Sequence, residues 1–338
     1  MLPALLSTLL RGDDLTTDQA SQAMDVVMRG DAHPAQVAGL LIGLAMKGER
    51  PAELVGFART MRARGVTIDA GPGAVDTCGT GGDRAGTFNI STAAALVVAG
   101  AGVQVVKHGN RSVSSHCGSA DVLEALGVRI DARPGTVQRA VTEAGIGFCF
   151  APTFHPATRH AVDTRRALGV PTAFNLLGPL TNPARVRFQI VGVARPELTE
   201  LIARTLQQLG AERAWVVHGA DGLDELSTTG YTKVSECHGD IVRTFYLHPA
   251  DVGLAKALPA DLRGGDAEHN ARQIRAVLAG DKGPARDVVL LNAGAALFIC
   301  GRVPSLKQGL AAAATALDDG NASRALDALA AITGEGTA

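Results

Sequence analysis

The chain has 338 residues, enough for one large domain or for a small and a larger one, and 46% of them are hydrophobic. Its formal net charge of −1 excludes a global positive field that would recruit nucleic acid or an anionic membrane. The five cysteines have no CxxC spacing, which favours reduced thiols in a cytoplasmic protein over disulfides or a metal site. No charge-free apolar run is long enough to predict a membrane span.

Four short helices are predicted within the first 65 residues. A leucine stripe ends at Gly12, and Thr16 with Gln19 forms a capping box that opens the second helix. Pro34 and Pro51 stand at the first positions of the third and fourth helices, where proline is well tolerated. This helical region carries no catalytic spacing.

After Gly71 the pattern changes to short apolar strands that alternate with helices. The predicted strands are residues 75–78, 104–106, 147–150, 188–193 and 214–217. The predicted helices are residues 91–99, 119–126, 136–143, 155–168 and 197–209. A hairpin is predicted from residues 232–236 and 241–246, and the last 70 residues are Ala-rich and helical. This alternation predicts an α/β fold with a central, mostly parallel sheet and crossover helices.

A glycine-rich turn follows the first predicted strand. Residues 79–83 read Gly-Thr-Gly-Gly-Asp, and Asn89 and Ser91 stand at the start of the next helix. Glycines let backbone N–H groups approach an anion closely, and the N-terminus of a helix adds positive charge. A tight turn with an ordinary helix cap would use the same residue types, and the turn matches neither a Walker loop nor GxGxxG. Taken alone, the turn is a weak indication of a phosphate site.

A polar loop follows the second predicted strand. Residues 107–115 read Lys-His-Gly-Asn-Arg-Ser-Val-Ser-Ser, so cations, an amide and hydroxyls leave the strand together. The carboxyl end of a strand is where open α/β sheets bind ligands, and these groups suit a phosphorylated one. Ser119, near the start of the next helix, would extend the site. A solvated polar loop is the alternative, which the apolar elements on both sides disfavour.

Adjacent carboxylates, Asp224 and Glu225, follow the strand at residues 214–217. Carboxylates at a strand end suit Mg²⁺, which characteristically bridges a few protein oxygens to substrate phosphates. An acidic surface loop is an equally common origin of such a pair.

Three arginines, Arg159, Arg165 and Arg166, lie on the predicted helix at residues 155–168. An arginine that faces a substrate cleft could bind a carboxylate through two parallel hydrogen bonds. Solvated arginines on a helix surface would account for most of the three.

Together and in this order, these pieces resemble the anthranilate phosphoribosyltransferases, over essentially the whole chain. The resemblance is carried by residues 76–83 (DTCGTGGD), 87–93 (TFNISTA), 107–127 (KHGNRSVSSHCGSADVLEALG), 174–184 (FNLLGPLTNPA) and 218–227 (HGADGLDELS). It implies a nucleoside phosphorylase-like fold with a small all-helical domain and a larger α/β domain. The helical domain would be residues 1–70, joined by an inserted helical segment at about residues 160–185, and the α/β domain residues 71–338. It also implies a homodimer in the cytoplasm.

The resemblance implies an enzyme of tryptophan biosynthesis. The reaction would transfer the phosphoribosyl group of phosphoribosyl pyrophosphate (PRPP) to the amine of anthranilate, giving N-(5-phosphoribosyl)anthranilate and pyrophosphate. Magnesium would be the cofactor, as two ions. PRPP and anthranilate would be the small-molecule partners, with no nucleic acid and no membrane.

The resemblance also assigns binding residues. For PRPP they are Gly79, Gly82, Asp83, Thr87, Asn89, Ile90, Ser91, Thr92, Lys107, His108, Gly109, Asn110, Arg111, Ser112, Val113, Ser114, Ser115 and Ser119. For anthranilate they are Gly79, His108, Asn110, His155 and Arg165, and for the metal Ser91, Asp224 and Glu225. No protein nucleophile is expected, because the anthranilate amine needs no deprotonation and the departure of pyrophosphate is the difficult step.

Two alternatives remain on the same fold. A nucleoside phosphorylase predicts a different phosphate loop, and the loop at residues 107–111 with Asp224 and Glu225 disfavours it. A non-catalytic, nucleic-acid-binding relative would need a basic surface, which the net charge of −1 disfavours.

Overall fold

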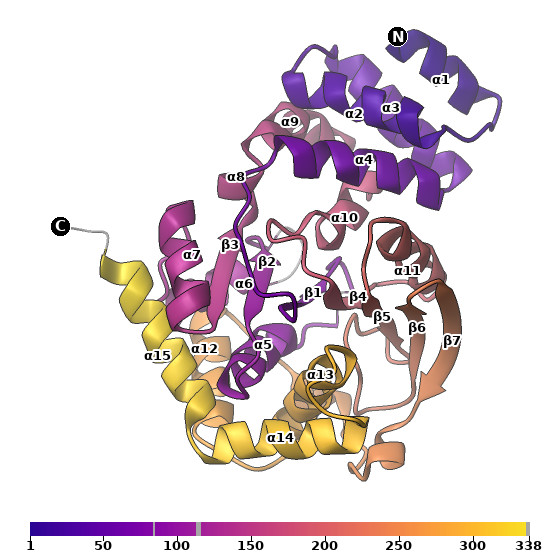
Figure 1. Cartoon of the computed structure of the whole chain (residues 1–338). Helices are drawn as coiled ribbons and strands as arrows, with labels where there is room; N and C mark the ends of the chain where they lie inside the picture. The colour runs from indigo at the N-terminus through magenta and orange to yellow at the C-terminus, as the bar shows by residue number, and fades with distance from the viewer. Residues whose placement is uncertain (84, 113–115, 336–338) are drawn as a thin grey trace.

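The N-terminal helices lie where the sequence predicts them. The computed structural model of the chain describes residues 1–83, 85–112 and 116–335 (Figure 1). The first helices are α1 (Leu2–Leu10), α2 (Thr17–Arg29), α3 (Pro34–Lys47) and α4 (Pro51–Arg64). The capping box of α2 is formed, since the Gln19 N–H donates to Thr16 Oγ1 at 3.2 Å and the Thr16 N–H donates to Gln19 Oε1 at 2.9 Å.

One sheet of seven strands organises the rest of the chain, in the order β3-β2-β1-β4-β5-β6-β7. Its strands are β1 (Val75–Gly79), β2 (Val105–Gly109), β3 (Ile146–Phe150), β4 (Phe188–Gly192), β5 (Arg213–Gly219), β6 (Thr232–His238) and β7 (Ile241–Leu247). Strands β1 to β5 run parallel, whereas β6 and β7 pair antiparallel as the predicted hairpin. The predicted mostly parallel sheet is therefore confirmed.

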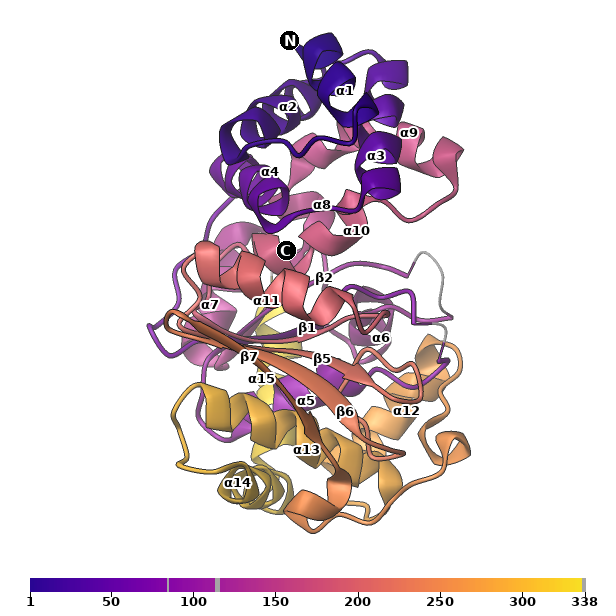
Figure 2. The ribbon, with the colours of Figure 1, turned by 90° about the vertical axis from the view of Figure 1, so that its right-hand side faces the viewer.

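Helices cover both faces of the sheet (Figure 2). They are α5 (Ile90–Gly100), α6 (Ser119–Ala125), α7 (Pro134–Glu143), α11 (Leu198–Gln208), α12 (Ala267–Leu278), α13 (Pro284–Ile299), α14 (Leu306–Asp318) and α15 (Asn321–Gly334). Alternate side chains point to opposite faces, so Ile190 joins the apolar cluster of α5 and α13 while Val191 joins that of α11. Single-turn helices η3 (Pro249–Val252) and η4 (Pro259–Leu262) follow β7. No helix in the described residues is long and apolar enough to cross a membrane.

The prediction of one helix over residues 155–168 is wrong at the N-terminal end of the helix. The structure has α8 (Ala151–Phe154), a 3₁₀ turn η1 (Pro156–Thr158) and then α9 (Arg159–Leu168). His155 interrupts the helix, with φ −126° and ψ 59°, because its buried ring is hydrogen bonded at 2.8 Å to the carbonyl of Thr181. The segment continues through α10 (Ala173–Leu177) and the 3₁₀ turn η2 (Pro179–Thr181).

This later segment completes the N-terminal bundle. Helix α9 packs on α2 and α3, α10 packs on α3 and α4, and η2 packs on α4. Ala161 and Phe174 share one apolar cluster with Leu40 and Phe57 of the bundle. The same cluster continues into α11 and the adjoining face of the sheet, so the bundle and the sheet share a core.

Candidate active site

The loops that the sequence singles out meet at one edge of the sheet. Strands β1, β2, β4 and β5 end at this edge, and Gly79 of β1 is directly opposite Gly192 of β4. From β1 the sheet is extended in one direction by β2 and β3 and in the opposite direction by β4 and β5. The direction in which strands are added therefore reverses between β1 and β4. Such a reversal is where doubly wound sheets bind ligands.

The glycine-rich turn after β1 contacts the acidic loop after β5. The Gly81 N–H donates to Asp224 Oδ2 at 3.0 Å, and Asp83 Oδ2 lies 3.5 Å from the Asp224 nitrogen. A β-carbon on Gly79 would lie 2.5 Å from Asp224 Oδ2, and Gly82 has φ 87°. The glycines are therefore required by close approach and by backbone conformation.

The start of α5 contacts the second carboxylate. The Ser91 N–H donates to Glu225 Oε1 at 3.0 Å, so this carboxylate lies at the positive end of the helix. Buried Lys107 donates from Nζ to the Thr77 carbonyl and lies 3.5 Å from Ser91 Oγ. Residues from β1, α5, β2 and the β5 loop thus meet within hydrogen-bonding distance.

The carboxylates resist ionisation together. Burial raises the pKa of Asp224 well above its usual range, and the charges of Asp83 and Glu225 raise it further. Burial raises the pKa of Glu225 to about 7, although Lys107 and Ser91 act in the opposite direction. A cation placed among these oxygens would relieve both effects.

The donor set fits magnesium better than a metal with an all-protein cage. Among the described residues, no group of three or more His, Cys, Asp or Glu side chains is arranged to hold a metal ion by itself. Mg²⁺ is commonly held by one or two carboxylates and completes its shell with water and substrate phosphates. Asp224, Glu225 and the Ser91 hydroxyl match that pattern.

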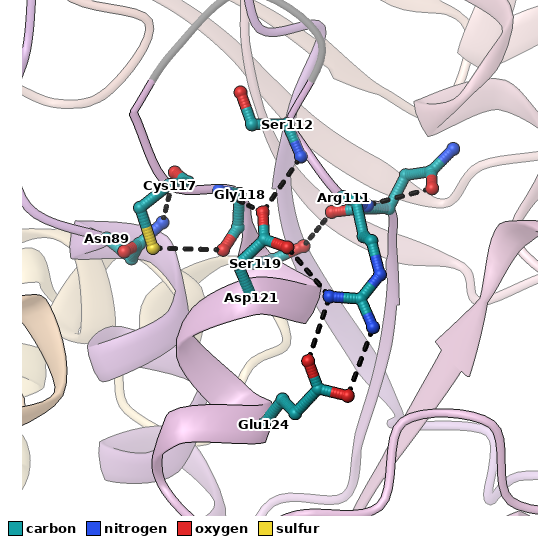
Figure 3. Close-up of polar contacts among 9 residues, drawn as sticks. Asn89, Arg111, Ser112, Cys117, Gly118, Ser119, Asp121 and Glu124 are labelled. Atoms are coloured by element: carbon teal, nitrogen blue, oxygen red, sulfur yellow. Dashed lines mark hydrogen bonds and ion pairs between the residues drawn. The ribbon is translucent and has the colours of Figure 1, made fainter. Parts of the chain in front are cut away.

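The loop after β2 is tied to α6 (Figure 3). Arg111 makes two hydrogen bonds to Glu124, at 2.9 and 3.0 Å, and one to Asp121 at 2.9 Å. Asp121 Oδ2 also accepts from the N–H groups of Ser112 and Gly118. As a direct PRPP ligand, Arg111 would have to leave these carboxylates. Val113, Ser114 and Ser115 lie outside the described residues.

Several of the predicted PRPP residues have their side chains engaged elsewhere. Asn89 donates to the Cys117 carbonyl at 3.1 Å and accepts from Asn270 at 3.0 Å, which ties the start of α5 to its neighbours.

Ile90 and Thr92 have buried side chains, each 1% exposed. Their backbone N–H groups donate to the carbonyls of Phe88 and Asn89, so both residues help to form the start of α5. Thr87 is partly exposed beside the turn, and Ser119 Oγ lies 3.4 Å from the Asn110 carbonyl.

His108 and His155, two of the residues predicted for anthranilate, lie together. Their ring centroids are 5.1 Å apart, and their other partners are the carbonyls of Gly178 at 3.0 Å and Thr181 at 2.8 Å. Burial lowers the pKa of His108 to about 3, and burial also lowers that of His155. Both rings are therefore neutral at physiological pH, and both are buried, His108 being 7% and His155 3% exposed.

Arg165 and Arg166 differ in environment. Arg165 is partly buried, with its guanidinium 5.0 Å from the ring centroid of Phe174, and burial lowers its pKa. Arg166 has a side chain 79% exposed and lies 3.5 Å from Asp163 on the same helix surface. Asn110 is exposed in the loop after β2, where its side chain accepts from the Arg111 N–H.

Three residues that position the site were not singled out from the sequence. A β-carbon on Gly192 would lie 1.5 Å from the Asp224 carbonyl oxygen, so the acidic loop crosses directly over the end of β4. Asn292 of α13 accepts from the Leu226 N–H at 3.1 Å and donates to the Leu226 carbonyl at 2.9 Å. In the sequence, Asn292 is an amide among apolar residues of a helix, and this pattern could have indicated a buried residue with a structural hydrogen bond. Asn182 lies within a quoted motif and donates to Asp76 at 2.8 Å.

Comparison with known proteins agrees with this geometry. The family described as "Glycosyl transferase family, helical bundle domain" matches residues 3–65, and "Glycosyl transferase family, a/b domain" matches residues 71–323. The anthranilate phosphoribosyltransferase of Moorella thermoacetica is 53% identical over 332 residues, covering 98% of each chain. That of Thermomicrobium roseum is 54% identical, covering 97% of this chain and 96% of its own. The chain belongs to the anthranilate phosphoribosyltransferase family.

Solved structures of the family have the same fold. The anthranilate phosphoribosyltransferase of Thermus thermophilus superposes with a TM-score of 0.92 at 44% identity, covering 97% of this chain and 98% of its own. The Saccharomyces cerevisiae enzyme in complex with PRPP and Mg gives 0.90 at 28% identity, covering 99% and 98%. The yeast enzyme in complex with 4-fluoroanthranilate gives 0.88 at 27% identity, with the same coverage.

Proposed function

We propose that this chain transfers the phosphoribosyl group of PRPP to the amine of anthranilate, giving N-(5-phosphoribosyl)anthranilate and pyrophosphate in tryptophan biosynthesis. One observation carries the proposal: the glycine-rich turn, Lys107 and the Asp224-Glu225 pair converge at the reversal of strand order. The names of the relatives and the ligands of the yeast structures support the same substrates.

PRPP would bind across the turn and the start of α5. Backbone N–H groups of the turn would donate to pyrophosphate oxygens, and Lys107 would add a fixed positive charge behind them. At the start of α5 the N–H groups of Ser91 and Thr92 already donate within the protein, so this end of the helix would act through its positive dipole. Asp224, Glu225 and Ser91 would hold two Mg²⁺ ions. Bound magnesium would neutralise the charge that develops on the departing pyrophosphate. The chain supplies alignment and charge, and no side chain attacks the ribose.

Anthranilate would bind beside His108 and His155. Neutral rings suit an aromatic acceptor whose ring and amine are themselves uncharged. The Arg165 guanidinium would pair with the carboxylate of anthranilate, while Asn110 would contact the acceptor from the loop after β2. The amine would then lie next to the ribose carbon from which pyrophosphate leaves.

We further propose the division and assembly of the chain. Residues 1–70 and about 160–185 would form the helical domain, with residues 71–338 as the α/β domain. The chain would act as a cytoplasmic homodimer, without nucleic acid or membrane partners. Leu10 and Met46 support an interface on the bundle, because these apolar side chains of α1 and α3 are 87% and 84% exposed.

The test is the PRPP-dependent loss of anthranilate fluorescence. The unaltered chain is expected to consume anthranilate only when both PRPP and Mg²⁺ are present. The double variant Asp224→Asn, Glu225→Gln keeps the acceptors for Gly81 and Ser91. It should fold with an unchanged or higher melting temperature, since neutral amides avoid the burial cost and the repulsion that raise the pKa of both carboxyl groups.

The double variant should lose Mg²⁺-dependent turnover. Asp240→Asn, in the exposed β6–β7 turn, is the control and should retain it. No PRPP-dependent loss of fluorescence in the unaltered chain would refute the function. Full activity in the double variant would refute the metal assignment alone.

A further inference from the structure

An arginine-lined cavity of ≈ 390 Å³ lies at the opposite edge of the sheet from the candidate active site. Arg59 and Arg62 contribute from the last turns of α4, and Arg185 contributes from the segment that leads into β4. Gln208, at the end of α11, lies on the third side. The parallel strand β4 begins here at Phe188 and ends at the candidate active site, so the length of the strand separates the two places.

The cavity carries unbalanced positive charge. In the described part of the chain, its lining includes no Asp or Glu, and Arg59, Arg62 and Arg185 form no ion pair. Arg62 donates to the carbonyls of Leu180 at 2.7 Å and Leu209 at 3.4 Å, and these bonds do not neutralise its charge or use all the N–H groups of its guanidinium. Burial lowers the pKa of Arg62 to about 10, and the charge of nearby Arg185 lowers it further.

The carboxylate nearest along the chain is already used elsewhere. Glu212 directly follows the lining residue Ala211, but its Oε2 lies 2.8 Å from Nη2 of Arg187. Glu212 and Arg187 form an ion pair at the surface, and each neutralises the charge of the other. The three arginines of the cavity therefore keep their charge close together without a counter-ion from the described residues.

The backbone places Arg185 in the cavity at a conformational cost. Among the described residues, Arg185 is the only one other than glycine with a positive φ, at 50°. Its turn is fixed from the core, because the Arg185 N–H donates to the Asn182 carbonyl at 2.9 Å and the Asn182 side chain donates to Asp76 and to the Val106 carbonyl, both at 2.8 Å. An unfavourable backbone conformation that is rigidly supported is characteristic of binding positions.

We propose that this cavity binds a phosphate group, either free or carried by a small metabolite, at a site separate from that of the transfer reaction. A doubly charged oxyanion would relieve the repulsion between Arg62 and Arg185 and would attract Arg59, which lines the same cavity. A guanidinium group has parallel N–H donors that match the spacing of phosphate oxygens, and Arg62 would use the donors that its two carbonyl partners leave. The volume accommodates more than a single phosphate ion, so a phosphorylated metabolite also fits.

A crystal soaked with selenate, a doubly charged oxyanion visible by anomalous scattering, locates the site directly. The expected result is an anomalous peak between the guanidinium groups of Arg62 and Arg185. Peaks confined to the glycine-rich turn and the start of α5 would overturn the proposal.

Calorimetric titration with inorganic phosphate tests the site in solution. Arg59→Gln should weaken one phosphate site roughly tenfold or more, the loss expected when a charge-assisted hydrogen bond is removed. Arg204→Gln is the matched control, since Arg204 is on α11 and already paired with Glu200 at 2.6 Å. Equal phosphate affinity in these two variants would overturn the proposal.

Arg185→Gly is the second variant. Glycine adopts the positive φ of this position readily, so the variant should fold while it loses one positive charge of the cavity. The same weakening of phosphate binding is expected, and unaltered binding by folded Arg185→Gly would contradict the proposal. Repeating the titrations with ribose 5-phosphate distinguishes the sources, because a metabolite-borne group should bind more tightly than free phosphate. None of these measurements depends on transferase activity, so the two proposals can fail separately.

Discussion

At Gly192 the absence of a side chain lets the acidic loop lie directly on the sheet. Gly192→Ala would place a β-carbon 1.5 Å from the Asp224 carbonyl oxygen, so the loop has to move. A displacement of about 1 Å in a positioning group lowers turnover by about 10²-fold, and we expect a loss of this size in kcat/KM with a weaker dependence on Mg²⁺. Steady-state kinetics over a Mg²⁺ series measures both.

Gly230→Ala is the control for this change. A β-carbon there meets nothing closer than the Ala220 β-carbon at 3.8 Å, so its kinetics should be unaltered. If Gly192→Ala is as active as Gly230→Ala, the acidic loop does not need its observed position.

Arg165 and Arg166 provide a comparison within one helix. Arg165→Ala should raise the KM for anthranilate by about one to two orders of magnitude, as expected for the loss of a charge-assisted pair worth about 1.5–3 kcal/mol. Its KM for PRPP should change little, because the turn and the loop after β2 form that site. Exposed Arg166 should tolerate alanine. Steady-state kinetics of both variants with both substrates measures these changes. A raised KM for anthranilate in Arg166→Ala alone would show that Arg166, and not Arg165, binds the carboxylate.

Site residues differ in how visible they are from sequence. Lys107, Asp224 and Glu225 stand in motifs that combine charge with glycine after a strand, so the type of chemistry could be predicted. Gly192 could not, because its requirement arises from a loop more than thirty positions later that crosses over it. The engagement of Arg111 with Asp121 and Glu124 also depends on how the loop folds back onto α6.

At the scale of elements, β6 is joined to both of its neighbours through Glu236. This carboxylate is 1% exposed, accepts from the Trp215 indole at 2.9 Å and pairs with Arg213 and Arg243, each at 2.7 Å. Burial raises its pKa, but the hydrogen bonds from Trp215, Arg213 and Arg243 outweigh burial and leave the pKa below its usual value.

Glu236→Gln should therefore destabilise the protein in a pH-dependent way. With a folded pKa below the unfolded one, the charged carboxylate contributes stability in full above about pH 4.3, and that stability is lost as the pH falls through the folded pKa. The free energy of unfolding should fall by about 1–3 kcal/mol at pH 7. Urea unfolding between pH 7 and pH 3 measures whether this difference shrinks in acid.

Glu212→Gln is the control, since Glu212 pairs with Arg187 at the surface and should contribute at most about 1 kcal/mol. A difference at Glu236 that stays constant to pH 3 would show that shape, and not charge, stabilises this part of the sheet.

Elements were predicted well where local signals agree. Prolines, glycines and the capping box mark the N-terminal helices, and apolar runs mark the strands. The predicted start of the helix that contains α9 was wrong because the His155 ring is hydrogen bonded to the Thr181 carbonyl, a partner that no local sequence pattern reveals. The strand order, with β1 between β2 and β4, also depends on long-range pairing.

At the scale of the molecule, the bundle and the sheet share apolar contacts. The sequence indicates two domains, yet α4 packs on α10, η2 and α11, and one apolar cluster runs from the bundle to the sheet. A chain shortened to residues 71–338 would expose the surfaces that α4 covers. We expect it to aggregate or to lose the cooperative thermal transition of the full chain, as measured by calorimetry. A sharp transition at the melting temperature of the full chain would show that the larger part folds alone.

The late completion of the bundle has a consequence for synthesis on the ribosome. Helices α1 to α4 are made first, but α9 and α10, which cover α2, α3 and α4, follow far later in the chain. At about 5–20 residues per second, translation from Gly65 to Leu177 takes on the order of 10 s. During that interval the apolar surface of the nascent bundle faces solvent and other chains. The helical bundle therefore stays partly uncovered until α9 and α10 have been made.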